Sequence, residues 1–543
     1  MAGTVLTRNL PDAYRFRLHG PFYWPAARTL LAMAVPLGLL LLTGRLDLLP
    51  AAVFGALSSV YGRTEPYYRH ARTLGAVAAG LVLAVAAGEL IAVFAGGTPA
   101  HEVVALAATA FVGAAATVIC AAVKVGPPGG LIFAFATGAC AHLPLTAADL
   151  GPHLAAAVLC AAFAWTVNVA GAAAIGLTPQ RRAAAAALDA TADALAARTD
   201  LAARADLTAP DLAARPDLAA RHSAAVAVEA AWHGLALVGE RHRGTGEHRD
   251  LVRAVHACEL LLAPGAPEVT PAELRAAAEA ARAGEPLPEL HPAGGRALAP
   301  LPASRWPIIR DVLRAALRPR LGGSWLLSYG LRVFTAALVA GLIADLLGFG
   351  HAYWAAVSAV SVLQATSTAT SVPRMLQRVT GTVFGVLVGA AVLSAQPAVW
   401  VLLVVLVLLQ WGAEMTVTIN YGLGLLFATP VALLVSALGT PADPAALAAN
   451  RFWTTLLGAA VAVAAAWLLP HRAWLSRVHT ALARVRALST AEPVHPPALR
   501  GALVELHEAY EQAAGEIRPA LLPTESLLTA AHAAYARLDA RRA

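Results

Sequence analysis

Charged residues are scarce in this sequence of 543 residues. Asp, Glu, Lys and Arg make up 13% of the chain, whereas a soluble protein carries about 25%. A chain so poor in charge cannot expose all of its surface to water, so we expect several segments to lie in lipid. The net charge of +7 is then better explained by membrane topology than by nucleic acid, and we expect no nucleic-acid partner.

Enzyme motifs are missing as well. The sequence contains no GxxxxGK[ST] phosphate loop, no GxSxG nucleophile turn and no HExxH zinc motif. Its four cysteines form no CxxC pair and have no zinc spacing with histidine, so we interpret them as small buried hydrophobes. We therefore expect a protein that is not an enzyme and that has no cofactor and no metal site.

What the sequence has is apolar runs. A bilayer core needs about 20 helical residues, and twelve runs come close to or exceed that length. The second and the eighth are short, and short segments in matching places of two halves point to a transport site. The predicted spans are 26–44, 48–62, 73–95, 103–123, 129–145, 153–177, 327–349, 352–366, 377–395, 397–414, 421–440 and 449–469.

The first six runs match the last six. Arg28 aligns with Arg332, and after a two-residue insertion Arg72 aligns with Arg378. Unrelated apolar helices rarely share polar and small residues at a nearly constant shift. The pattern predicts two parallel six-helix repeats, the kind related by an axis along the membrane normal.

Lys and Arg are concentrated in alternate short loops, which the positive-inside rule places in the cytoplasm. We therefore predict an all-α polytopic protein of a bacterial plasma membrane, with both termini cytoplasmic. Its parts are a cytosolic segment (1–25), a first membrane repeat (26–177), a cytosolic helical domain and linker (178–324), a second membrane repeat (325–470) and a cytosolic helical tail (471–543).

The region between the repeats carries helix signals. Residues 249–262 place Leu251, Val255, Cys258 and Leu262 on one stripe. Residues 270–273 read as a capping box with Pro at the first helical position, and Gly284 lies beyond the expected helix end. Residues 304–320 predict an interfacial amphipathic helix, with a soluble helix packed on the cytosolic domain as the alternative.

Ionisable and polar groups near the spans are the candidate pathway, because charge in a bilayer is costly and usually functional. The four aligned arginines predict a cytoplasmic vestibule that attracts anions; for Arg28 and Arg332 the alternative is that they are topology anchors that snorkel to the interface. Glu414 is the candidate for proton coupling, with an interfacial helix cap as its alternative. The short spans add Ser59, Tyr61, Ser361 and Gln364, although serines also serve as packing contacts between membrane helices.

The second half carries the pattern Arg-x-x-Gly-Thr-x-x-Gly from Arg378 to Gly385, followed by Asn420-Tyr421 and a helix with Thr429-Pro430. With a cytosolic domain between two such halves, the chain resembles the fusaric-acid-resistance-like family. That family includes bacterial exporters of aromatic carboxylic acids and has distant relatives in plant aluminium-activated malate channels. The resemblance adds Asn420, Tyr421 and Thr429 to the candidate pathway.

The resemblance implies gradient-driven export of small organic anions. Two other functions fit the sequence: a passive anion channel, and a non-transporting membrane scaffold that acts through its cytosolic domain. The lipid bilayer and a small organic anion are the expected partners, and the sequence is compatible with a homo-oligomer.

Overall fold

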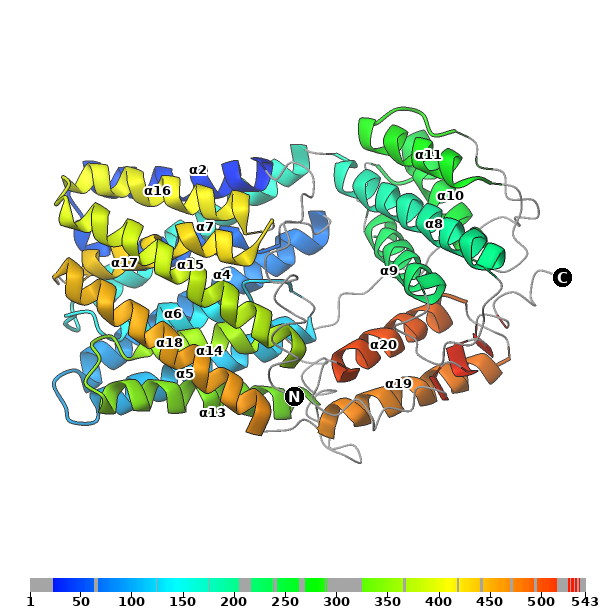
Figure 1. The fold of residues 1–543 in the computed structure, drawn as a ribbon. Helices are drawn as coiled ribbons and strands as arrows, with labels where there is room; N and C mark the ends of the chain where they lie inside the picture. Colours follow the sequence, from blue (N-terminus) through cyan, green and yellow to red (C-terminus); the bar gives the residue numbers. More distant parts are fainter. Residues whose placement is uncertain are drawn as a thin grey trace.

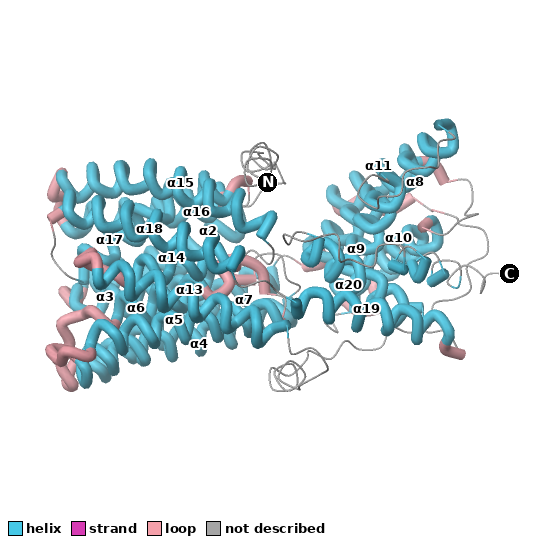
Figure 2. The backbone as a smooth tube through the Cα atoms, turned by 60° about the horizontal axis from the view of Figure 1, so that its bottom comes forward, coloured by secondary structure: helices cyan, strands magenta, loops and turns pink. Residues whose placement is uncertain are grey.

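The computed structural model is helical, and the residues that it describes form no strand (Figure 1). Two groups of helices stand apart along the long axis of the molecule (Figure 2). One is a block of roughly parallel apolar helices, and the other contains shorter, more polar helices. The described residues are 23–62, 67–123, 125–174, 176–204, 216–236, 238, 242–262, 269–288, 290, 325–364, 368–417, 419–439, 443–468, 472–492, 496–514 and parts of 526–537.

Helices of the apolar block fall on the predicted spans. Among the described residues, nine are long and apolar enough to cross a membrane. The first half holds α2 (Tyr23–Leu42), η1 (Leu46–Leu48), α3 (Leu49–Ala56), η2 (Leu57–Val60), α4 (Tyr67–Ala95), α5 (His101–Ala122), α6 (Leu131–Cys140) and α7 (Leu150–Ala174). The second half holds α13 (Trp325–Leu346), α14 (Tyr353–Leu363), α15 (Thr368–Ser394), α16 (Val399–Thr416), α17 (Tyr421–Gly439) and α18 (Pro444–Leu468).

Three predicted spans fall on shorter apolar helices. The second is α3 followed by the 3-10 turn η2, and the eighth is α14, of 11 residues. The fifth, α6, is 10 residues long and ends at Cys140 rather than at 145. Pro144 explains the early end, because proline has no backbone N–H and disfavours helical geometry in the residue before it.

Helix contacts in the two halves correspond in pairs. The contact of α15 with α17 has its counterpart in α4 with α6, and that of α14 with α18 in α3 with α7. Between the halves, α13 packs on α5 and α16 packs on α2. At the centre, α14 contacts α6 and α17 contacts α3. The short helices α3, α6 and α14 therefore lie where the two halves meet.

Glycines on α15 allow it to approach α17 closely. A Cβ added at Gly381 would lie 2.3 Å from the carbonyl oxygen of Gly422, and one at Gly385 would lie 2.7 Å from Cβ of Thr429. Gly389 faces Leu433 in the same way, at 2.7 Å. The stripe of glycines four residues apart is thus a helix contact, which holds the second half of α15 against α17 from Gly422 to Leu433.

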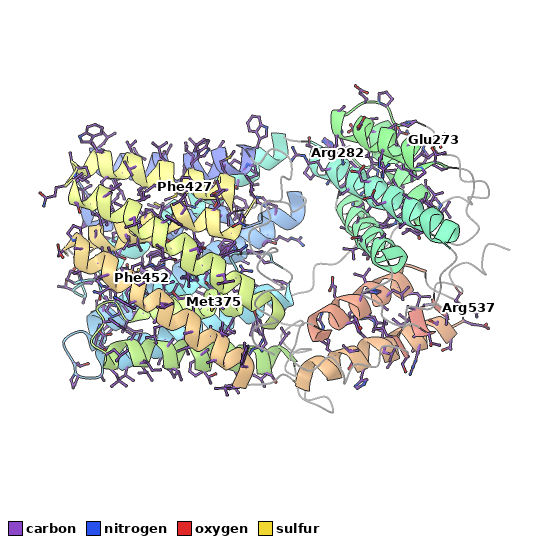
Figure 3. The ribbon with its side chains drawn as sticks, viewed as in Figure 1. Glu273, Arg282, Met375, Phe427, Phe452 and Arg537 are labelled. Atoms are coloured by element: carbon purple, nitrogen blue, oxygen red, sulfur yellow. The ribbon has the colours of Figure 1, made fainter. Side chains whose placement is uncertain are left out.

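Large apolar side chains stand on the outward faces of the block (Figure 3). Water would penalise such a belt, whereas lipid accommodates it. Members that are more than half exposed include Leu83, Phe94, Phe111, Leu159, Phe384 and Trp400.

The polar helices form two small cores outside the block. One contains α8 (Thr178–Arg204), α9 (Pro216–Ala236), α10 (Gly246–Leu261) and α11 (Pro271–Ala283). The other contains α19 (Arg472–Thr490) and α20 (Pro496–Ala514), and α20 also contacts α9. Because α7 leads through 176–177 into α8, the end of the block where α7 finishes faces these cores (Figure 1). We call it the near end; the far end carries the turns before α3, α5, α7 and α14.

Local signals in the polar region are confirmed. Leu251, Val255 and Cys258 are buried on one face of α10. Thr270 and Glu273 form the predicted capping box of α11, and Gly284 ends that helix in the left-handed conformation with φ of 79°. Arg282 and Arg275 of α11 pair with Asp189 and Asp193 of α8. The predicted amphipathic helix at 304–320, most of the N-terminal segment 1–25 and Lys124 lie outside the described residues.

Candidate functional site

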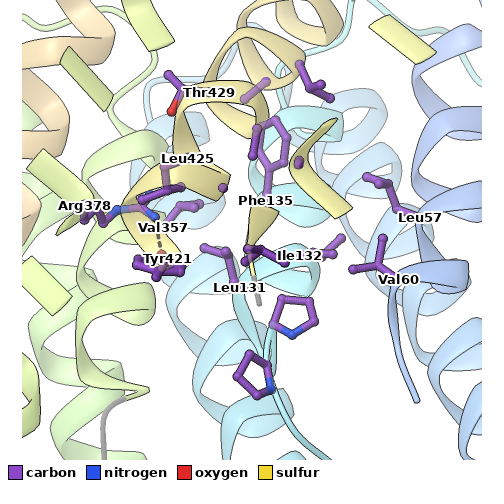
Figure 4. A pocket seen from close by; sticks show the side chains of 18 of the residues that line it. Leu57, Val60, Leu131, Ile132, Phe135, Val357, Arg378, Tyr421, Leu425 and Thr429 are labelled. Carbon is purple, nitrogen blue, oxygen red and sulfur yellow. Dashed lines mark hydrogen bonds between the residues drawn. The ribbon is translucent and has the colours of Figure 1, made fainter. Parts of the chain in front are cut away.

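A cavity of about 160 Å³ lies between the two halves. It is roughly ten times the ~15 Å³ that the smallest water-holding cavity needs. Leu57 and Val60 from the first half line it, with Pro127, Pro128 and the α6 residues Leu131, Ile132 and Phe135 (Figure 4). The second half supplies its polar side chains, which are Gln364, Arg374, Arg378, Gln410, Glu414, Tyr421, Thr429 and Arg451.

The cavity extends inward from the near end. Val60, Gln364, Val417 and Tyr421 all lie where a helix begins or ends at the near end. Arg451, seven residues after the start of α18 at the far end, lines its deeper part. The cavity therefore enters the block from the side of the polar helices.

Two hydrogen bonds hold the Arg378 side chain in the site. This side chain is 1% exposed and donates a hydrogen bond to the Tyr421 hydroxyl at 3.1 Å (Figure 4). It donates another to Oγ of Ser358 at 3.2 Å. The Tyr421 hydroxyl also lies 3.3 Å from Oγ of Ser361. These contacts, together with the glycine stripe, hold the guanidinium at the meeting point of α14, α15 and α17.

Two more arginines line the same cavity. The Arg374 guanidinium lies over the Tyr421 ring, 4.7 Å from its centre, and that of Arg451 lies 4.9 Å from the centre of the Trp354 ring. Both contacts are cation–π interactions, which satisfy a cation without neutralising it. Among the described residues, none of Arg374, Arg378 and Arg451 forms a salt bridge. The site thus concentrates positive charge in a largely apolar setting.

One carboxylate shares the cavity with these arginines. Glu414 is 3% exposed, and its Oε1 accepts a hydrogen bond of 3.3 Å from Gln410, one turn earlier on α16. The neighbouring Trp411 is 39% exposed, so Gln410 and Glu414 lie on the inner face of the helix. Glu414 is thus a buried acid in the last turn of α16.

An aromatic cluster separates the cavity from the far end. The ring of Phe135, in the cavity wall, meets Phe54 edge-to-face at 5.1 Å and stacks on Tyr353 at 6.5 Å. The Tyr353 hydroxyl lies 3.4 Å from that of Ser436. Beyond the cluster is a second cavity of about 20 Å³, lined by Phe54, Tyr353 and His142 among others. The aromatic cluster therefore lies between the two cavities.

Of the sequence-predicted pathway residues, Arg378, Gln364, Tyr421, Thr429 and Glu414 line the cavity. Ser361 supports it through Tyr421. The remaining ones do not line it. Arg28 is half-buried and donates to the carbonyl oxygen of Asn168 at 3.3 Å, Arg72 is exposed, and Arg332 is buried on α13.

The other three predicted residues have structural contacts. The Tyr61 hydroxyl donates to the Gly129 carbonyl at 2.7 Å, which holds the turn before α6. The carbonyl of Ser59 accepts a hydrogen bond of 3.5 Å from Thr29. Asn420 caps α17, because its side-chain oxygen accepts from the backbone N–H groups of Gly422 and Leu423 at 2.8 and 3.3 Å.

Three polar cavity residues were not on the predicted pathway: Arg374, Gln410 and Arg451. Arg451 lies within the predicted span 449–469, and the rule that intramembrane charge marks function would have pointed to it. Arg374 precedes the predicted span 377–395 and resembles an ordinary topology anchor in the sequence. Only the fold turns it onto the ring of Tyr421.

The polar side chains of the cavity all lie between 364 and 451. Residues 338–465 match the model of the fusaric acid resistance protein-like family. The resemblance read from the second half is therefore confirmed for this region. The fusaric acid resistance-like region contains every polar residue that lines the cavity, while the first half contributes mainly its apolar wall.

A relative in Bacillus subtilis (strain 168) is described as "Uncharacterized membrane protein YvaC". It is 28% identical over 199 residues, which are 35% of this chain and 31% of that protein. The matched part thus spans about a third of each protein and supports a membrane protein without indicating a substrate. No solved structure matches the chain.

Proposed function

We propose that the chain is a plasma-membrane transporter that exports small organic anions of the aromatic carboxylate type and is driven by an ion gradient. The supporting observation is the set of three arginines that line one cavity and form no salt bridge among the described residues. A buried charge without a counterion costs several kcal/mol. A bound carboxylate would supply the missing negative charge.

The apolar walls of the cavity fit the aromatic ring of an aromatic carboxylate. Leu57, Val60, Leu131, Ile132 and Phe135 form an apolar side facing the arginines. A planar carboxylate can accept two hydrogen bonds from one guanidinium, while an aromatic ring would gain from contact with the apolar side. An apolar pocket with a few convergent polar groups is the usual form of a small-molecule site.

The paired helix contacts support a two-repeat transporter. If the six helices of each half are repeats, the site lies at their interface, where transporters of this design bind substrate. The polar helices α8–α11 and α19–α20 would then be cytosolic, and the cavity would open inward. Movement of Phe54, Phe135 and Tyr353 would open the far end, so alternating access requires this cluster to separate.

Glu414 is the proposed site of coupling. It is the acid in the cavity wall, and its protonation would change the net charge that a carboxylate meets there. Proton relays in transporters use acids buried at such places. The missing phosphate loop is in keeping with a gradient as the energy source.

Transport in inside-out membrane vesicles tests the proposal. We expect vesicles with the protein to accumulate a labelled aromatic carboxylate such as benzoate when a proton gradient, acid inside, is imposed, and to lose this accumulation with an uncoupler. A passive channel would equilibrate the anion with or without the gradient. A scaffold would give no uptake above empty vesicles, and either result would overturn the proposal.

A further inference from the structure

Two histidines and one glutamate meet at the far end of the block, away from the cavity. His101 and Glu102 begin α5, and His142 follows the end of α6. One ligand atom from each of the three lies within 4.8 Å of the others. The side chains of Glu102 and His142 are 41% and 19% exposed, so an ion can reach them.

The hydrogen bonds of His142 determine which atom faces the glutamate. Its Nδ1 lies 2.7 Å from the Gly138 carbonyl oxygen, which can only accept, so Nδ1 carries a hydrogen. In the neutral ring Nε2 then has a lone pair, and it lies 3.2 Å from Oε2 of Glu102. Two acceptors at this distance repel each other unless a proton or a cation lies between them.

The geometry suits a metal ion. Ligands that bind tetrahedral zinc at about 2.0–2.1 Å lie about 3.3 Å from each other, close to the 3.2 Å between His142 and Glu102. A metal-bound histidine usually donates its other N–H to a backbone carbonyl or carboxylate, as His142 does to Gly138. Nδ1 of His101 is buried and has no hydrogen-bond partner among the described residues.

We propose that His101, Glu102 and His142 bind one divalent transition-metal ion of the zinc and cobalt class. Two imidazoles and a carboxylate are a donor set that such ions prefer over magnesium or calcium. The ion would link the start of α5 to the end of α6. No sequence motif marks this site, because Glu102 and His142 lie 40 residues apart. The inference stands apart from the proposed transport function.

Metal binding to the purified full-length protein, carried on a tag without histidine and stripped with a chelator, tests the site. We expect one Co²⁺ per chain with the visible absorption of a low-coordinate nitrogen and oxygen site, and displacement of Co²⁺ by Zn²⁺. His101→Ala and His142→Ala should each weaken Co²⁺ binding at least about tenfold. Glu102→Gln, which keeps size but removes charge, should weaken it as well.

His351→Ala is the matched control, since its ring lies in the same aromatic surroundings, 5.9 Å from Tyr353, but outside the ligand set. It should bind Co²⁺ like the unchanged protein. Absence of stoichiometric binding in the unchanged, folded protein would overturn the proposal and show that a proton alone joins His142 and Glu102. Equal binding by folded His142→Ala would overturn it too.

Discussion

The guanidinium of Arg378 donates a hydrogen bond to the hydroxyl of Tyr421, 3.1 Å away, and so joins α15 to the first residue of α17. Both residues line the same cavity, and the glycine stripe beneath them sets the distance between their helices. The Arg374 guanidinium lies over the ring of the same tyrosine. Tyr421 therefore orients two of the three arginines of the proposed anion site.

Tyr421→Phe should weaken anion transport while leaving the fold intact. The change removes the hydroxyl that holds Arg378 and Ser361, but keeps the ring under Arg374. One hydrogen bond is worth about 0.5–1.5 kcal/mol, so KM should rise roughly 2- to 12-fold. Tyr329→Phe is the control, because that buried hydroxyl donates to the Leu363 carbonyl and does not line the cavity. Equal KM for Tyr421→Phe and the unchanged protein would contradict this role.

Gly385→Leu should destabilise the membrane block. Its side chain would collide with Cβ of Thr429, 2.7 Å away, and with the Leu425 carbonyl oxygen, 2.9 Å away. Overpacking of this kind costs about 1–3 kcal/mol, so Tm in detergent should fall. Gly38→Leu is the matched control, as no atom lies within 4 Å of a Cβ there. A similar Tm for the two variants would show that α15 and α17 can move apart without loss of stability.

Phe135→Ala should make the protein leak. The residue separates the larger cavity from the far end through its contacts with Phe54 and Tyr353. Its loss is expected to allow anion flux that persists after an uncoupler removes the gradient. Phe133→Ala, on the same helix but packed on Tyr61 at 5.9 Å, should not leak. Folding of both variants is checked by size-exclusion chromatography. A folded Phe135→Ala variant that shows no such anion flux would rule out the cluster as the barrier.

Cys258 should be inert in the folded protein. Burial raises the pKa of its thiol to about 12, compared with about 8.5 for an unfolded cysteine. Because the folded pKa is the higher one, this group destabilises the native state only as pH rises above about 8.5, where the unfolded thiol ionises. Maleimide labelling at pH 8, followed by peptide mass spectrometry, should modify Cys258 only after denaturation. Rapid labelling in the native state would contradict the packing of α10.

Local patterns in the sequence predicted much of the helical structure. The glycines at 381, 385 and 389 indicated a close helix contact, and the neighbours of each now show that α17 provides it. The capping box at Thr270 was equally readable, because its partners are three residues apart. Both signals act within one helix or one helix face.

The cavity could not be read in the same way. Its walls come from η2, α6 and five helices of the second half, and their meeting depends on packing between segments hundreds of residues apart. Alignment of the halves treated Arg72 and Arg378 alike, yet one is exposed and the other buried. Which member of an aligned pair faces inward is determined by the tertiary contacts of each half.

Equilibrium binding of an aromatic carboxylate to the purified protein tests the central claim most directly. Arg378→Gln and Arg451→Gln should each weaken binding at least about tenfold, since a hydrogen bond to a charged group is worth about 1.5–3 kcal/mol. Arg72→Gln, the exposed counterpart in the first half, should bind as the unchanged protein does. Equal affinity in all three folded variants would contradict an anion site formed by these arginines.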